Sequence, residues 1–171
     1  MSTIILFLAF TLVGSPAHSA IPSASAVRDR IRPLDRTSEQ LVADGLRRSP
    51  TIASLIDHLV HSTVIVYVSA AGDLRIPGAL TFMAHSDGVT YVLVRVQPML
   101  VPDERLAALG HELQHAREIA DAGDSVENDP TLAALYKKIG FQAGRDAFES
   151  PGARATEALV RRELSSAAAA R

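Results

Sequence analysis

One stretch of the 171-residue chain, from Pro102 to Gly123, constrains its fold more than any other, because its pattern predicts a helix with polar groups on one face. Apolar residues recur in it at spacings of three and four, Pro102 supplies a start signal and Gly123 a stop signal. Residues 111–115 within this stretch read HELQH. On a helix, two histidines four residues apart lie on one face and can present two imidazole nitrogens to one metal ion. We therefore expect a helix that buries its leucines and turns both histidines toward a cleft.

The glutamate between these histidines, Glu112, adds a second chemical function. A carboxylate beside a bound metal ion can polarise a water molecule and take its proton. A lone histidine on a helix is more often a packed or surface residue than a ligand, but packing gives no reason to group two histidines with a carboxylate. The chain has no cysteine, so any metal has only nitrogen and oxygen ligands. These features predict a Zn²⁺ site with His111 and His115 as ligands and Glu112 as the catalytic base.

The beginning of the chain has the composition of a secretory signal peptide. An apolar run from Ile4 to Val13 precedes small residues, and cleavage after Ser19 would place Ala17 and Ser19 at the positions that a signal peptidase reads. The run is shorter than the roughly 20 residues that a membrane span needs, and no second run could span a bilayer. We expect residues 1–19 to be removed on export to the periplasm or the extracellular space, which leaves a mature chain without an integral membrane span.

The remainder of the chain is long enough for one compact domain. Residues 20–36, rich in Ser, Ala, Pro and Arg, predict a loosely ordered lead-in, and residues 37–171 predict the domain. A net charge of -2 and 5% aromatic residues argue against a nucleic-acid-binding surface. Without cysteine there is no disulfide framework, so the hydrophobic core alone must stabilise the domain. The sequence leaves the oligomeric state open.

Periodicity and turn signals predict an α+β fold. The expected elements are, in order, helices over residues 37–48 and 50–61, strands over 63–69, 79–85 and 89–97, the histidine helix, and helices over 131–139 and 150–164. Ser49-Pro50 is an N-cap followed by a first-turn proline, and the turn at Asp87-Gly88 joins the last two strands as a hairpin. We therefore expect a three-stranded, mainly antiparallel sheet packed against the histidine helix and its flanking helices.

A catalytic zinc site needs a third protein ligand and an open position for water. No histidine follows His115, so the third ligand is expected to be a downstream carboxylate. The candidates are Glu118, Glu127, Glu149, Glu157 and Glu163. Glu118 lies one turn beyond His115, where it can orient a ligand but reaches the same metal only awkwardly. For the others the alternative role is a solvated helix surface or a contact with a helix N-terminus, and the residues by themselves leave the choice open.

A resemblance narrows this choice. The HELQH motif followed by Glu149 in the segment ESPGA resembles the gluzincin peptidases, whose third zinc ligand is that glutamate. The segments HSTVIVYV, YVLVRV, LGHELQHAREIAD, LAALYKKIG and RREL resemble a family of small exported bacterial proteins with a zincin helix, most of them uncharacterised. The resemblance implies a small zincin-like domain with His111, His115 and Glu149 as zinc ligands, and Glu157 as the remaining alternative. Pro151 and Gly152 stand where a plain helix would be expected.

The predicted function is that of a zinc-dependent metallopeptidase, which hydrolyses peptide bonds of a peptide or protein substrate with a zinc-activated water. Tyr136 is either a core tyrosine or a donor to the developing oxyanion. The alternative is a non-catalytic exported module that binds zinc or a peptide, and a third possibility is a histidine pair without metal. A closed fourth coordination position would favour the module, whereas an open site along a strand edge would favour the peptidase.

Overall fold

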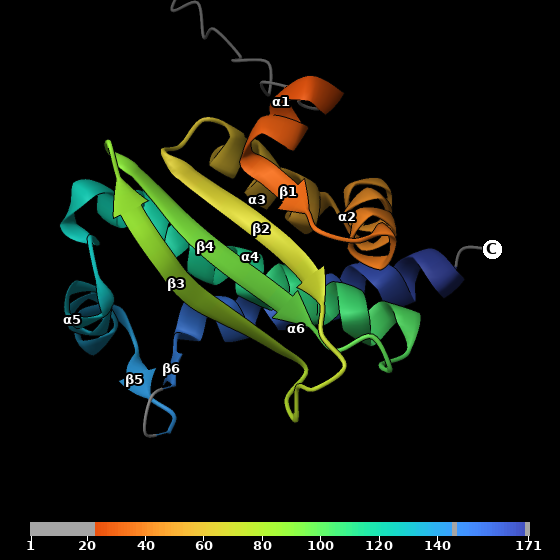
Figure 1. Ribbon diagram of the computed structural model, residues 1–171. Coiled ribbons are helices and arrows are strands. Elements are labelled where there is room, and N and C mark those ends of the chain that lie inside the picture. The colour runs from red at the N-terminus through yellow and green to blue at the C-terminus, as the bar shows by residue number, and fades with distance from the viewer. Residues whose placement is uncertain (1–22, 145–146, 170–171) are drawn as a thin grey trace, which may run out of the picture.

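Helices cover one face of a mixed β-sheet in the computed structural model, which describes residues 23–144 and 147–169 (Figure 1). The signal peptide expected over residues 1–19 lies outside the described residues. The described elements are, in chain order, α1 (Ala24–Arg30), β1 (Ile31–Pro33), α2 (Arg36–Arg48), α3 (Pro50–Val60), β2 (Val64–Ala70), β3 (Gly78–Ser86), β4 (Val89–Val96), α4 (Pro102–Ala122), the short 3-10 helix η1 (Gly123–Ser125), α5 (Asp129–Ile139), β5 (Phe141–Gln142), β6 (Phe148–Glu149) and α6 (Pro151–Ala169).

The main sheet has four strands in the order β1-β2-β4-β3. The pairs β1–β2 and β2–β4 are parallel, and only the edge strand β3 runs antiparallel to its neighbour β4. The α+β class is confirmed, but the expectation of a three-stranded, mainly antiparallel sheet is wrong. Helices α2 and α3 supply the crossover that a parallel β1–β2 pair requires. The β3–β4 hairpin then lies with β4 inside and β3 at the free edge, an arrangement that strand periodicity does not encode.

The extra strand, β1, comes from the stretch that the sequence led us to expect as a loosely ordered lead-in over residues 20–36. Here the structure has α1 and β1, and Ile31 in β1 is completely buried. With three residues, the last of them Pro33, β1 is too short to show an alternating pattern, so sequence periodicity could not reveal it.

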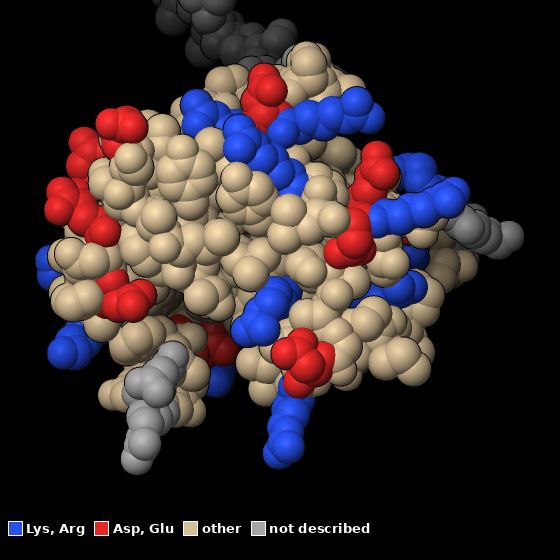
Figure 2. Space-filling view, in the orientation of Figure 1, with Lys and Arg blue, Asp and Glu red and all other residues tan. Residues whose placement is uncertain are grey.

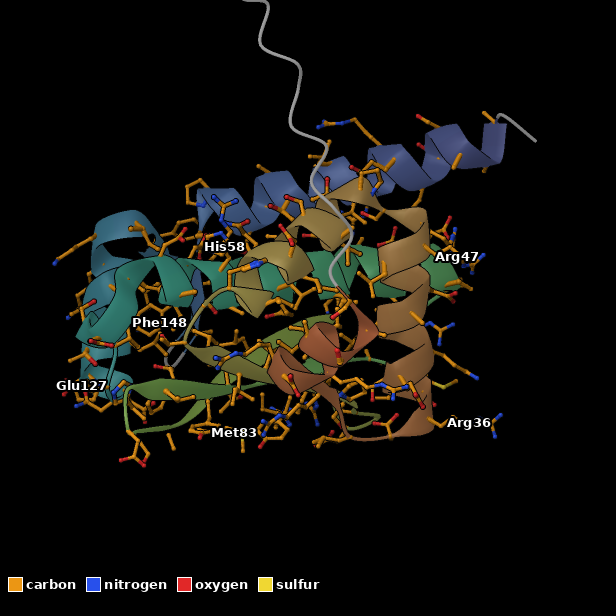
Figure 3. The ribbon with its side chains drawn as sticks, turned by 90° about the horizontal axis from the view of Figure 1, so that it is seen from above. Arg36, Arg47, His58, Met83, Glu127 and Phe148 are labelled. Atoms are coloured by element: carbon orange, nitrogen blue, oxygen red, sulfur yellow. The ribbon has the colours of Figure 1, made fainter. Side chains whose placement is uncertain are left out.

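The molecule has three layers when it is seen from above: the sheet, then α3 and α4, and then α6 (Figure 3). In β4 buried residues alternate with partly exposed ones, so one face of the strand packs onto α4. Met83 on β3 points away from the helices and is 52% exposed (Figure 3). The hairpin turn at Asp87 and Gly88 is confirmed, since both residues have the positive φ angles, 52° and 72°, of a two-residue hairpin turn.

Most helix boundaries follow the predicted capping signals. Ser49 caps α3 by accepting a hydrogen bond from the N–H of Ile52. Helix α5 has Asn128 as its N-cap and begins at Asp129, two residues before the start expected at Thr131. Helix α6 extends to Ala169, beyond the end expected at Leu164. Across the described residues, no helix combines the length and the hydrophobicity that a membrane crossing requires.

Helix α4, the predicted histidine helix, lies between the sheet and α6. It ends where expected, at Gly123, whose φ is 57°. A Cβ atom at Gly110 would lie 2.8 Å from Cγ2 of Val160 on α6. The missing side chain at Gly110 therefore allows α6 to approach α4 closely, and this contact places the first turns of α6 beside the two histidines.

Candidate metal centre

Two histidines from α4 and one glutamate from β6 converge on a common point. Oε1 of Glu149 lies 3.5 Å from Nε2 of His111 and 3.7 Å from Nε2 of His115. One ligand atom from each of the three residues lies within 4.8 Å of the other two, so the group could hold a metal ion. Around a tetrahedral ion with bonds of about 2.1 Å, neighbouring ligand atoms are about 3.4 Å apart. The two distances from Glu149 to the histidine nitrogens are close to this value, so the group could hold such an ion.

Glu149 owes its position to the short β5–β6 hairpin and to the start of α6. Glu149 pairs with Phe141 across the hairpin. A Cβ atom at Gly140 would lie only 2.1 Å from the carbonyl oxygen of Glu149, so no larger residue fits there without moving β6. The N–H of Ser150 donates to Oε1 of Glu149 over 2.8 Å. Pro151 begins α6 rather than interrupting it, so the ligand immediately precedes a regular helix.

We call Nε2 of each histidine, which lies near Glu149, its inner nitrogen, and Nδ1 its outer nitrogen. The outer nitrogen of His111 is oriented by Glu157, the alternative third ligand. Oε2 of Glu157 lies 3.1 Å from Nδ1 of His111, on the other side of the ring from Glu149. Oε1 of Glu157 in turn pairs with Arg161 at 2.6 Å, and Arg161 also pairs with Glu104. Glu149 therefore lies next to the inner nitrogens of both histidines, whereas Glu157 holds the ring of His111 in place from its outer nitrogen.

The outer nitrogen of His115 has a similar carboxylate partner. Nδ1 of His115 lies 2.9 Å from Oε2 of Glu118 and 3.0 Å from the hydroxyl of Tyr136. Oε1 of Glu118 accepts a hydrogen bond from Oγ of Ser150 over 2.6 Å. Tyr136, 3% exposed, also has a hydrogen bond with Glu118. The ring of Phe148, which is labelled in Figure 3, stacks on the ring of Tyr136 with centroids 5.6 Å apart. Tyr136 is thus a buried residue whose hydroxyl is engaged beside a ligand, and not a donor aimed at an incoming substrate.

Charge and burial set the protonation of the groups around His115. Burial lowers the pKa of His115, but its hydrogen bond to Glu118 and the charges of Glu112, Glu118 and Glu149 outweigh burial and leave the pKa raised. Burial likewise opposes ionisation of Glu118, but its hydrogen bonds with His115 and Ser150 leave its pKa lowered. An ionised Glu118 accepts the Nδ1 proton of His115, which leaves the Nε2 lone pair free for a metal.

Glu112 lies beside the three candidate ligands and is not one of them. Its side chain is buried between α4 and the start of β3, where the N–H of Leu80 donates a hydrogen bond to it. Burial raises the pKa of Glu112 to about 7, against the opposing charge of His115 and with a further rise from Glu149 and Glu157. A buried carboxylate with this pKa can accept and release a proton near neutral pH.

The other candidate glutamates have different roles. Glu163 accepts hydrogen bonds from the side chains of Ser49 and Thr51, each over 2.5 Å, at the N-terminus of α3. This is the helix N-terminal contact that the sequence offered as the alternative to metal binding. Glu127 lies in the loop before α5, where its N–H donates to the hydroxyl of Thr131.

The centre is partly open to solvent. The side chains of His111 and Glu149 are each 15% exposed, and that of Glu157 is 22% exposed. Figure 2 shows a recess between the free edge of β3 and the β5–β6 hairpin, with acidic side chains inside it. Arg154 stands beside the ligands, with its Nε 3.4 Å from Oε2 of Glu149 and its guanidinium over the ring of Phe141. A separate groove of about 770 Å³, formed by α1, β1 and α2, contains none of these residues.

Comparisons of the chain with models of known families, with curated proteins and with solved structures gave no significant match. The class of the site is therefore defined by its geometry alone. It is a group of two imidazoles and one carboxylate that could bind a metal ion, with a buried glutamate next to it.

Proposed function

We propose that the protein is a zinc-dependent metallopeptidase of the gluzincin type. The observation that carries this proposal is the convergence of His111, His115 and Glu149 on one point, where Oε1 of Glu149 lies 3.5 Å and 3.7 Å from the two Nε2 atoms. Two imidazoles and one carboxylate are a ligand set typical of zinc, whereas calcium and magnesium prefer oxygen ligands alone. The carboxylates on both outer nitrogens support this assignment, because zinc-bound histidines commonly have such partners.

The number of ligands favours catalysis over a structural metal. Among the described residues, the group contains only three side chains that could bind the metal. A structural zinc site usually has four protein ligands, whereas a catalytic site has three and leaves one position for water or substrate. The partial exposure of Glu149 and His111 is consistent with access to that position. The peptidase is therefore a better proposal than a non-catalytic zinc-binding or peptide-binding module.

Glu112 is the proposed catalytic base. A zinc ion bound by the three ligands would acidify a water molecule and polarise the carbonyl group under attack. Glu112, buried beside the ligands, is placed to accept the proton of that water and to deliver it to the departing amine. Its raised pKa suits both steps near neutral pH.

The free edge of β3 supports a peptide as the substrate. The N–H of Gln97, which follows β4, donates to the carbonyl of Pro77, which precedes β3. In an antiparallel pair hydrogen-bonded residues alternate, so Ala79 and Thr81 face β4 while the main-chain groups of Gly78 and Leu80 point to the free edge. The N–H of Leu80 donates to Glu112 there, so the groups offered to a peptide are the N–H and C=O of Gly78 and the C=O of Leu80. An extended peptide can add to such an edge through main-chain hydrogen bonds.

Zinc analysis combined with Glu112→Gln tests the proposal. We expect the purified parent protein to contain one equivalent of zinc and to cleave a mixture of internally quenched peptides. Glu112→Gln should keep the zinc and lose the cleavage, because glutamine fills the same space but cannot take a proton. His115→Ala should lose both. A Glu112→Gln variant that cleaves at the parent rate, or a parent protein that binds no zinc, would overturn the proposed function.

A further inference from the structure

We infer that Gly78 and Leu80, at the start of β3, are positioning residues for Glu112. The inference rests on the proposed function, in which Glu112 is the catalytic base. Glu112 is a buried residue of α4, and its side chain has several rotatable bonds, so the helix backbone alone does not fix the position of its carboxylate. Contacts with β3 determine where the carboxylate stands, and the two residues provide them in different ways.

Gly78 provides space. A Cβ atom at this position would lie 2.8 Å from Oε1 of Glu112 and 2.9 Å from its Cγ. Both distances are well below ordinary van der Waals contact, so the side chain of Glu112 occupies the volume that any other residue at position 78 would fill. The absence of a side chain at Gly78 thus allows the carboxylate to lie directly against the edge of the sheet.

Leu80 provides a hydrogen bond. Its N–H points to the free edge of β3 and donates to the carboxylate of Glu112, while its side chain packs against the hydrophobic core. Because Gly78 and Leu80 are two residues apart on one strand, they act on the carboxylate from the same edge. The space at Gly78 and the N–H donor at Leu80 together select one orientation of the Glu112 carboxylate beside the proposed metal ligands.

The contact at Gly78 involves only the flexible end of a side chain. The three atoms nearest to a Cβ at position 78 are all side-chain atoms of Glu112, and none belongs to the backbone. Gly78→Ala can therefore be accommodated by rotation of Glu112, without displacement of β3 or of α4. The substitution should leave the fold and the metal ligands intact and misplace only the carboxylate.

The kinetic test compares Gly78→Ala with Gly72→Ala in the zinc-loaded protein. Gly72, in the loop before β3, is a matched control because a Cβ there meets no atom within 4 Å. We expect Gly78→Ala to keep its zinc and its KM and to lose about tenfold to a hundredfold in kcat, the size of effect that small misplacement of a reacting group produces. Gly72→Ala should behave as the parent. Unchanged kcat in Gly78→Ala, or a loss confined to KM or to zinc content, would contradict the inference.

A shorter base should relieve the collision. Glu112→Asp withdraws the carboxylate by one methylene group, so it reduces kcat in the parent background. In the Gly78→Ala background the same shortening makes room for the new methyl group, and the two losses should not add. Fully additive losses would show that Gly78 acts on some other part of the molecule.

A measurement that needs neither zinc nor substrate separates the inference from the proposed function. In the metal-free protein, the amide proton of Leu80 should move upfield in NMR spectra on Glu112→Ala and on Gly78→Ala, because both remove its carboxylate acceptor. The amide of Gly88 in the β3–β4 turn should stay in place. If the Leu80 resonance does not move, the positioning contact is absent. If it moves while Glu112→Gln still hydrolyses peptides, the contact stands and the catalytic assignment falls.

Discussion

Gly140 shows how one residue without a side chain decides the position of a candidate metal ligand, Glu149. The carbonyl oxygen of Glu149 lies 2.1 Å from the place of a Cβ at Gly140. Unlike the contact at Gly78, this contact is with the backbone, which cannot rotate away. The glycine at the end of α5 therefore sets the distance between that helix and β6, and through it the reach of Glu149 toward the two histidines.

Replacement of Gly140 should weaken metal binding. We expect Gly140→Ala to push β6 outward and to lower zinc affinity about tenfold to a hundredfold, as changes that displace or disorient a ligand do. Gly144→Ala, in the same hairpin, is the control, because its Cβ would be in ordinary contact with Ala147 at 3.5 Å. Competition titration with a chromogenic chelator measures both variants. Equal affinities in the two variants would exclude Gly140 as the residue that sets the position of Glu149.

At the scale of elements, a single carboxylate connects α2 to the sheet. Asp35 is the N-cap of α2, where its Oδ1 accepts from the N–H of Ser38 over 2.8 Å. Its Oδ2 accepts from the N–H of Ala70 at the end of β2 over 3.0 Å. Burial raises the pKa of Asp35, but these hydrogen bonds outweigh burial and leave the pKa below its ordinary value of 3.8. Ser38 is the reciprocal partner in this cap, because its hydroxyl accepts a hydrogen bond from the N–H of Asp35.

Asp35→Ala should lower the free energy of unfolding by about 1 to 2 kcal/mol at neutral pH, the cost of losing an N-cap. Because the folded protein lowers the pKa of Asp35, the ionised form stabilises the fold. This contribution is complete above the ordinary pKa of 3.8 and is lost as the pH falls through the lower folded value. Urea unfolding at neutral and acidic pH measures the difference between parent and variant. A difference that stays constant as Asp35 is protonated would refute the assigned role.

For the molecule as a whole, the candidate metal centre is where the elements meet. It combines histidines and Glu112 from α4, Tyr136 from α5, Glu149 from β6 and Glu157 from α6. Four carboxylates, those of Glu112, Glu118, Glu149 and Glu157, lie around two imidazoles, so the metal-free centre gathers acidic groups within a partly buried space. A bound cation would reduce their repulsion and connect α4 with β6. Metal binding is therefore expected to stabilise the entire fold.

Zinc should raise the melting temperature. At a free concentration of about 100 times Kd, binding adds about 2.7 kcal/mol to the stability of the native state. For a chain of this size, that corresponds to a rise in Tm of about 5 to 10 °C. Because the raised pKa of His115 favours the protonated imidazole, which cannot bind zinc, the rise should shrink as the pH falls. Calorimetry with zinc and with EDTA measures this rise in Tm.

His115→Ala is the control, and its Tm should not change with zinc. A parent protein whose Tm is also unchanged by zinc would argue against the proposed centre.

Local patterns in the sequence were sufficient for most of the secondary structure and for part of the site. Helical periodicity and capping residues predicted α2 to α6, and the Asp87-Gly88 turn predicted the hairpin, because each depends on neighbours in the chain. The spacing of His111 and His115 placed both on one face of α4 for the same reason. Glu149 was preferred over the other carboxylates only through a resemblance, since spacing alone left five candidates.

Tertiary structure alone decided the strand order of the sheet and which carboxylate lies next to the two histidines. The sheet is mixed, because the order in which strands pair depends on contacts far apart in the chain, and β1 was too short to carry a pattern. Glu149 rather than Glu157 faces both inner nitrogens because α6 begins at Pro151 and sends Glu157 to the outer side of His111. The sequence itself determined which side chains can bind a metal ion. Their meeting at one point depends on the packing of α4, β6 and α6, which no local periodicity records.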